Sequence, residues 1–161
     1  MHLKGHYIIP APLPVMWDAI TDPHLLSECV PGCQSITQVT DTLYTGQIHA
    51  KVGPVKAVFR GQLTLENLVI QQSHTMVVEG QGGLAGLAKA RADVQLKALE
   101  NEQTELHYQA STELTGLINR LASRLLTGTA YRYVDGFFAR FQDAVLARHQ
   151  ASPSLPPGTD G

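Results

Sequence analysis

The stretches AKARADVQLKA (residues 88–98) and ELHYQASTEL (residues 105–114) decide the fold. In both stretches, small or apolar residues alternate with charged or polar ones. A period of two is typical of a β-strand that buries one face and leaves the other in water. Two such strands in succession, with turn signals around them, predict an antiparallel meander.

The same period of two extends back to Cys33. Residues 44–52 and 55–66 alternate on either side of a Gly-Pro turn, and residues 70–80 form a further alternating segment. Together with the two decisive stretches, these segments predict about six consecutive antiparallel strands.

The residues before this region predict one more strand and two short helices. Residues 2–9 are rich in Tyr and Ile, and the prolines that follow them would end a strand there. Pro14 suits the first turn of a helix that extends to Ile20. Asp22 can cap a second helix with Pro23 at its first position, and a Pro-Gly pair would end that helix.

The last part of the chain changes period. Apolar residues between Thr115 and His149 fall at helical spacing, so we expect one long helix with a weak point at Thr127–Gly128–Thr129. We expect residues 1–149 to form a single domain and residues 150–161, rich in proline and glycine, to form a disordered tail. A curved antiparallel sheet of about seven strands would bury its apolar face on the long helix, which makes the fold class α+β.

Composition limits the function. The 161 residues are 43% hydrophobic and 16% charged, whereas roughly 25% of residues are charged in an average soluble domain. A net charge of −2 argues against a nucleic-acid partner. The sequence has no apolar run of about 18 residues that would predict a membrane-spanning helix. The first residues also lack the apolar core of a secretory signal, so we expect a cytoplasmic protein.

Small residues occupy many positions that strand parity places on the inner face of the sheet. Two explanations are open. The small residues allow close approach of the last helix or strong coiling of the sheet, or they leave an apolar cavity that one helix does not fill. These inner positions are Gly46, Ala50, Ala57, Gly61, Gly80, Ala88, Ala90, Ala92 and Ala110.

The chain also carries a series of short motifs, most of them with proline or glycine. These are Ala11–Pro12, Val15–Met16–Trp17, Asp22–Pro23, Cys29–Val30–Pro31–Gly32–Cys33, Val52–Gly53–Pro54, Phe59–Arg60–Gly61, Gly80–Gln81–Gly82–Gly83, Tyr108–Gln109–Ala110 and Leu114–Thr115–Gly116–Leu117. With these motifs, residues 1–147 resemble the CoxG family of carbon monoxide dehydrogenase subunits. The order of elements is similar to the helix-grip fold of START-like proteins, the superfamily that includes polyketide cyclase/dehydrase-like proteins.

The resemblance implies a non-enzymatic accessory protein of a molybdenum hydroxylase of the carbon monoxide dehydrogenase type. It also implies a hydrophobic pocket under the long helix, which would hold a quinone or a lipid, and a link between the enzyme and the membrane with its quinone pool. Some members of the family carry a C-terminal membrane anchor, whereas this chain ends in a short polar tail. We therefore expect a cytoplasmic protein, either free or peripheral at the inner face of the cell membrane.

We expect inward residues of the strands to line the ligand cavity and two leucines of the last helix to cover it. In this cavity Tyr108 and His74 would orient a polar head. The cavity residues are Ile48, Ala50, Phe59, Gly61, His74, Met76, Val78, Ala90, Ala92, Tyr108, Ala110, Leu121 and Leu125. Four residues at the start of the last helix form either a surface for a membrane or a partner protein, or the side of a core-facing helix with a solvated basic edge. These residues are Leu117, Ile118, Arg120 and Arg124.

No residue is singled out as catalytic, and we expect no metal and no cofactor. Cys29 and Cys33 lack the second pair of ligands that a zinc site needs, so we expect them to pack as small apolar residues. The glycine-rich segment 80–85 precedes a strand rather than a helix, which argues against a dinucleotide site.

Other functions stay open at this point. One is a START-like cyclase or dehydratase that acts on a hydrophobic small molecule, which polar side chains converging in the cavity would favour. Another is a general lipid-binding module. A third is a module without a ligand, in which the long helix fills the cavity and the surface alone recruits a partner.

Overall fold

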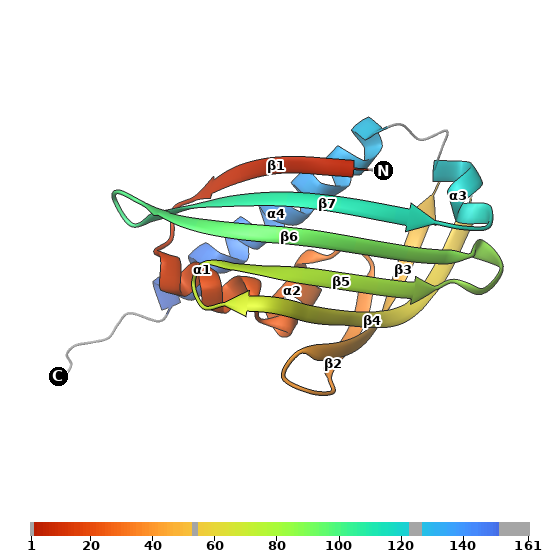
Figure 1. Cartoon of the computed structure of the whole chain (residues 1–161), viewed down its shortest axis with the longest axis horizontal. Coiled ribbons are helices and arrows are strands. Elements are labelled where there is room, and N and C mark those ends of the chain that lie inside the picture. The colour runs from red at the N-terminus through yellow and green to blue at the C-terminus, as the bar shows by residue number, and fades with distance from the viewer. Residues whose placement is uncertain (1, 53–54, 123–126, 152–161) are drawn as a thin grey trace.

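The computed structural model describes residues 2–52, 55–122 and 127–151, with side chains for residues 2–51, 56–120 and 131–150. Seven antiparallel strands form one sheet in the order β1-β7-β6-β5-β4-β3-β2 (Figure 1). The strands are β1 (His2–Ile9), β2 (Cys33–Gln38), β3 (Leu43–Val52), β4 (Val55–Val69), β5 (Ser73–Gln81), β6 (Leu87–Leu99) and β7 (Gln103–Leu114). The helices are α1 (Leu13–Ile20), α2 (Pro23–Cys29), the short 3-10 helix η1 (Gly83–Ala85), α3 (Leu117–Ala122) and α4 (Thr127–Ala151). The expected α+β fold with two short helices after the first strand is confirmed.

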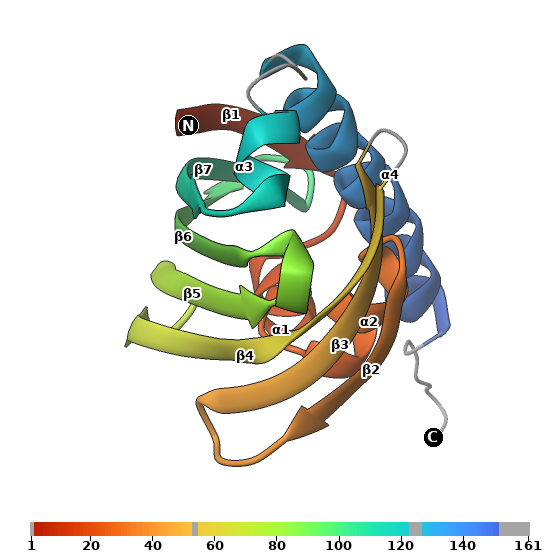
Figure 2. The ribbon, with the colours of Figure 1, turned by 90° about the vertical axis from the view of Figure 1, so that its right-hand side faces the viewer.

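Helix α4 crosses the concave side of the curved sheet, and α1 and α2 lie between α4 and the strands (Figure 2). Asp22 begins α2 by accepting hydrogen bonds from the main-chain N–H groups of His24 (2.9 Å) and Leu25 (3.4 Å). Arg148 of α4 pairs with the same carboxylate and so ties the two helices together. Burial alone would raise the pKa of Asp22, but the hydrogen bonds from Arg148 and from the helix N-terminus outweigh burial and lower it.

The prediction of one long helix over residues 115–149 is wrong, because the structure has two helices there. Thr115 is held at the sheet: its N–H donates to the carbonyl of Leu87 (2.9 Å) and its Oγ1 accepts from the N–H of Leu87 (3.2 Å). Gly116 then adopts a φ of +74°, which an α-helix does not contain. The Thr127–Gly128–Thr129 segment lies at the start of α4 rather than inside a helix.

The sheet carries a row of opposed small residues. Gly46 of β3 faces Gly61 of β4, Gly61 faces Gly80 of β5, and Gly80 faces Ala88 of β6. A Cβ atom on Gly61 would lie 1.8 Å from the carbonyl oxygen of Glu79, so no other residue fits at this position. Strands β3 and β4, which pair at Gly46 and Gly61, curve towards α4 (Figure 2).

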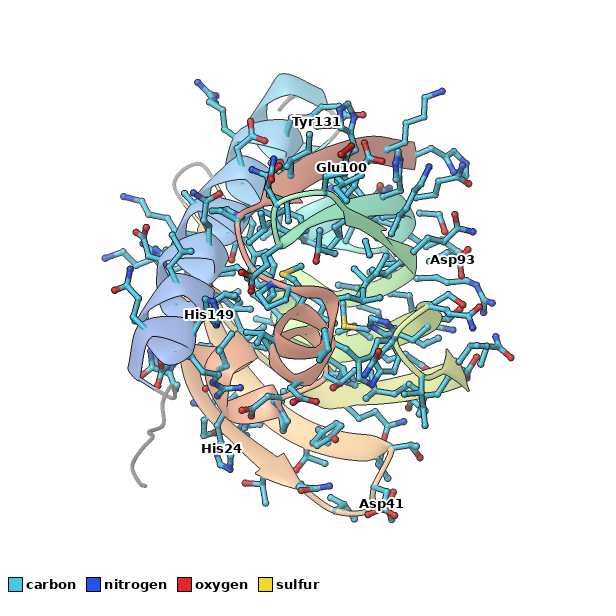
Figure 3. The ribbon with its side chains drawn as sticks, turned by 90° about the vertical axis from the view of Figure 1, so that its left-hand side faces the viewer. His24, Asp41, Asp93, Glu100, Tyr131 and His149 are labelled. Atoms are coloured by element: carbon cyan, nitrogen blue, oxygen red, sulfur yellow. The ribbon has the colours of Figure 1, made fainter. Side chains whose placement is uncertain are left out.

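The hydrophobic core occupies one half of the interior. Helices α1 and α2, strands β1, β6 and β7 and helix α4 supply it, and Leu106, Phe141 and Val145 are fully buried. The ring of Phe138 stacks on that of Tyr7 with a centroid distance of 4.1 Å and on that of Tyr108 at 5.8 Å. Three of the four phenylalanines of the chain lie on α4 in this core. The polar face of the sheet points the other way, as Asp93 shows (Figure 3).

His74 is a polar residue inside this apolar half. Its side chain is 2% exposed and meets the edge of the Trp17 ring at a centroid distance of 5.7 Å. Neither ring nitrogen has a hydrogen-bond partner among the described residues. Because burial disfavours the charged imidazolium, the pKa of His74 falls to about 4.

We predict that His74 makes the protein less stable in acid. Above about pH 6.5 the imidazole is neutral in both the folded and the unfolded chain. Between pH 6.5 and about 4 the unfolded chain binds a proton that the folded chain does not bind, so the free energy of unfolding falls by about 3 kcal/mol. His74→Leu should remove this loss and should also raise the stability at pH 7, since it removes two unpaired buried nitrogens. Urea unfolding at several pH values measures both effects, and equal pH slopes for the two proteins would contradict the assignment.

Candidate ligand-binding site

A cavity of about 550 Å³ lies in the other half of the interior. Its lining is almost wholly apolar. Strands β2 to β7, the end of α2, α3 and one residue of α4 contribute to it. The lining residues are Leu26, Ser27, Val30, Cys33, Ser35, Ile36, Tyr44, Thr45, Gly46, Gln47, Ile48, Ala50, Phe59, Gly61, Gln62, Leu63, Val78, Glu79, Gly80, Ala88, Lys89, Ala90, Thr112, Leu114, Ile118 and Tyr133.

The strand register explains where the cavity ends and the core begins. One row of opposed inward residues lines the cavity: Leu63, Val78, Ala90 and Thr112. The next inward row, two residues further along each strand, is Leu65, Met76, Ala92 and Ala110. In this second row Leu65 is buried, and Met76 and Ala110 pack against the core that α1 and α4 fill. The boundary therefore falls between two adjacent rows of the same sheet.

The structure brings together part of the predicted cavity. Six of the predicted residues line it: Ile48, Ala50, Phe59, Gly61, Val78 and Ala90. Five others lie on the core side of the boundary and do not line it: His74, Met76, Ala92, Tyr108 and Ala110. The ring of Tyr108 lies beside the stacked rings of Tyr7 and Phe138 in the core, and it does not line the cavity. The predicted covering residues fall outside the described part of the chain, which includes neither the side chain of Leu121 nor any of Leu125.

Sequence reasoning missed the contribution of the segment around α2. Leu26, Val30 and Ile36 close one side of the cavity, and their apolar character was visible in the sequence. Their position beside the cavity was not visible in the sequence, because it depends on how α2 packs against β2 and α4. Tyr133 of α4 was also missed, since one tyrosine on a helix gives no periodic signal.

Three polar side chains of the lining, those of Tyr44, Tyr133 and Cys33, contact main-chain carbonyls. The hydroxyl of Tyr44 donates to the carbonyl of Asp41 (3.1 Å), and that of Tyr133 donates to the carbonyl of Pro31 (3.0 Å). The thiol of Cys33 contacts the carbonyl of Ser35 at 3.6 Å, and burial raises its pKa. The cavity therefore offers a ligand mainly carbon surface.

The two charged residues of the lining contribute no charge to the interior. Glu79 and Lys89 occupy outward positions between inward neighbours on β5 and β6. Their side chains are more than half exposed, and Lys89 Nζ lies 4.0 Å from Glu79 Oε1. Only the parts of these residues near the main chain border the cavity.

The predicted contact surface on the last part of the chain is divided. Ile118 is 5% exposed and lines the cavity, so it is not available to a membrane surface. Leu117 is half-buried and borders a neighbouring groove of about 630 Å³, and Arg120 is exposed. Arg124 lies outside the described residues.

Cys29 and Cys33 are both free thiols, and Cys29 is buried. Burial raises the pKa of Cys29 to about 11, which suits a packing residue rather than a nucleophile. In residues 2–52, 55–122 and 127–151, no three His, Cys, Asp or Glu side chains are grouped as a metal site would need. Among the helices of these ranges, none is long and apolar enough to cross a membrane.

Several solved structures share this fold. A conserved protein from Geobacillus kaustophilus has 23% sequence identity and a TM-score of 0.84, covering 92% of this chain and 97% of its own. The ZhuI aromatase/cyclase from Streptomyces sp. R1128 has 11% identity and a TM-score of 0.70, covering 96% of this chain and 99% of its own. A START superfamily protein from Mycobacterium smegmatis has 9% identity and a TM-score of 0.62, covering 93% and 97%. At these identities the solved structures establish a shared fold.

None of the curated proteins matches the sequence closely. The family model for CoxG, a subunit of carbon monoxide dehydrogenase, does match it over residues 5–146, which is most of the chain and includes every strand that lines the cavity. The helix-grip architecture of START-like proteins, an apolar cavity between sheet and helices, and this family match agree with one another. The chain therefore belongs to the CoxG family of carbon monoxide dehydrogenase subunits.

Proposed function

We propose that the protein binds a quinone or a lipid in its cavity as an accessory protein of a molybdenum hydroxylase of the carbon monoxide dehydrogenase type. In this role it links the enzyme to the membrane by carrying the apolar molecule between them. The family and the START-like fold support an accessory protein that binds a hydrophobic ligand. The identity of the ligand, the enzyme and the membrane link are the parts that we propose.

The carbon lining of the cavity is the observation that carries this proposal. Its volume of about 550 Å³ lies within the usual range of small-molecule sites. An apolar cavity of about 150 Å³ stays dry and accepts benzene, so a cavity of this size accommodates a much larger apolar group. Removing apolar surface from water favours binding by about 25 cal/mol per Å², before the cost of association.

The chemistry of the lining supports a ligand that places an uncharged hydrocarbon chain or ring system in the cavity. No charged side chain among the described residues points inward at the cavity, since Glu79 and Lys89 pair on the outer face. An ionised group inside would lose its hydration without compensation. The isoprenoid chain of a quinone and the acyl chain of a lipid both satisfy this requirement, and their polar heads would lie at the edge of the cavity.

The alternative of a cyclase or dehydratase receives less support. Such an enzyme needs polar side chains that converge on one point of the substrate and exchange protons with it. Here the hydroxyls of Tyr44 and Tyr133 donate to main-chain carbonyls, and His74 lies in the core beside Trp17. The similarity to an aromatase/cyclase is one of fold at 11% identity.

A substitution that fills the cavity should abolish binding without unfolding the protein. Ala90 lines the cavity between Val78 and Thr112, and Ala90→Phe would place a ring in the void. We expect uptake of the fluorescent probe N-phenyl-1-naphthylamine to weaken by about tenfold or more, with no decrease in melting temperature, because the ring adds buried apolar surface.

Ala98→Phe is the matched control, since Ala98 is an exposed alanine of the same strand and lies away from the cavity. This variant should bind the probe as the parent does. Equal binding by the parent and Ala90→Phe would mean that the probe binds elsewhere.

Cys33 reports directly on occupancy, because it lines the cavity whereas Cys29 is only 1% exposed. We expect a small maleimide to modify Cys33 in the empty protein and to react several-fold more slowly after incubation with a short-chain menaquinone or a fatty acid. Intact mass spectrometry measures the rate, and Cys33→Ser identifies the labelled thiol. A labelling rate that no apolar molecule changes would contradict binding at this position.

The accessory role is tested by isolating the protein from its host without detergent. Native mass spectrometry should find an additional apolar mass on the protein, and affinity capture should recover subunits of a molybdenum hydroxylase. The Ala90→Phe variant should lack the apolar mass and still capture the enzyme. Repeated isolation of a ligand-free protein that captures no hydroxylase would reject the proposal.

A further inference from the structure

The connection between β5 and β6 carries an apolar side chain that is almost completely exposed. Leu84, in the middle of η1, is 98% exposed, more than any other large hydrophobic residue among those described. Figure 1 shows this connection at one end of the sheet, with the turn between β4 and β5 at the opposite end. In Figure 2 the same end faces the viewer and also carries α3. Leu84 therefore projects from the end of the molecule that α3 occupies.

The base of this connection is fixed, whereas its tip is free. The N–H of Gly82 donates to the carbonyl of Gly86 (2.8 Å), and Ala85 is 5% exposed. Gly86 has a φ of +108°, and a Cβ atom there would lie 1.9 Å from the carbonyl oxygen of Thr115. At Gly83, beside the tip, a Cβ atom would meet nothing within 4 Å. The chain thus holds Leu84 in water on a rigid support, although an exposed leucine contributes nothing to folding.

Further apolar and basic side chains lie beside Leu84. Val58 and Leu87 are 41% and 43% exposed. The groove of about 630 Å³ next to η1 is lined by Lys56, Ala57, Val58, Arg60, Gln81, Gly82, Gly83, Leu84, Ala85 and Leu117, with no carboxylate among them. On the same outer face Lys51 lies directly opposite Lys56 in the β3–β4 pair. No ion pair to Lys51, Lys56 or Arg60 forms within the described part of the chain.

This surface borders the cavity through Phe59. A Cβ atom on Gly82 would lie 2.6 Å from the Phe59 ring, and the same ring lines the cavity. One aromatic side chain therefore separates the surface around Leu84 from the proposed ligand site.

We propose that Leu84, with Val58 and the cations Lys51, Lys56 and Arg60, docks on a lipid surface that contains anionic headgroups. A projecting leucine enters the interface between headgroups and acyl chains, while lysine and arginine beside it meet phosphates. A protein partner of standard size would bury about 800 Å² on each side, which a single projecting side chain does not provide. The proposal rests on the proposed carrier function for its purpose, since docking here would bring the cavity to the membrane. The docking itself is independent of any ligand.

Vesicle flotation tests the docking with the whole protein. The parent should bind vesicles made of equal parts phosphatidylcholine and phosphatidylglycerol, and should bind phosphatidylcholine vesicles more weakly. Leu84→Ser should weaken binding to the anionic vesicles by about tenfold, and Lys56→Glu should do so by a similar factor and remove the preference for anionic lipid. Both residues are exposed, so the melting temperature should not change.

Ile70→Ser is the matched control, because Ile70 is 73% exposed in the turn between β4 and β5 at the opposite end of the sheet. This variant should bind vesicles as the parent does. Absence of vesicle binding by the parent, or an equal loss in Ile70→Ser and Leu84→Ser, would overturn the proposal. A parent protein that binds an acidic protein but no vesicles would overturn it as well.

Probe uptake separates this proposal from the proposed function. Leu84→Ser should take up N-phenyl-1-naphthylamine as the parent does. If the parent docks on vesicles through Leu84 but takes up no probe, the carrier function fails and the docking surface stands.

Discussion

The rest of the structure depends on a steric constraint at Gly61, which lies in the row of opposed small residues Gly46, Gly61, Gly80 and Ala88. Main chain lies where a side chain of residue 61 would be, so that position accepts only glycine. The constraint has two consequences. It lets the main chains of β4 and β5 approach closely at Gly61, and it leaves the inner face without bulky side chains in the same place. Of the two explanations that the sequence left open, the cavity lies at this row of residues, and the atoms that crowd Gly61 belong to the main chain of β5 and not to the last helix.

Helix α4 is held differently at its two ends. From Phe138 onwards it is buried through Phe138, Phe141 and Val145, and each such side chain contributes about 1.5–3 kcal/mol. Nearer its start, Tyr131 and Val134 are partly buried against the core, and tyrosine hydroxyls add hydrogen bonds: Tyr131 bonds with the main chain of Lys4 at 3.1 and 3.2 Å, where α4 passes β1 (Figure 3), and Tyr133 bonds with Pro31. Exposed hydrogen bonds of this kind contribute about 0.5–1.5 kcal/mol each.

Strand parity predicted the sheet and the inner face of the cavity, because the alternation of side chains along a strand is a local property. Ala50, Phe59 and Ala90 were found in this way. Parity could not separate Ala90 from Ala92, since both point inward and only the positions of α1 and α4 decide which of them meets a void. Helical spacing likewise continued from Leu117 to the end of α4 and did not reveal that α3 and α4 are two helices, nor that hydrogen bonds between Thr115 and Leu87 fix the point before α3 begins.

The central claim is that the half of the interior beside this row of small residues holds an apolar molecule. A crystal structure of the protein isolated from its host without detergent tests it most directly. We expect continuous electron density for an elongated apolar molecule in contact with Ala50, Phe59 and Ala90, with Tyr133 at its edge. A structure in which side chains of α3 and α4 close in and fill this volume, leaving no room for a ligand, would contradict the claim.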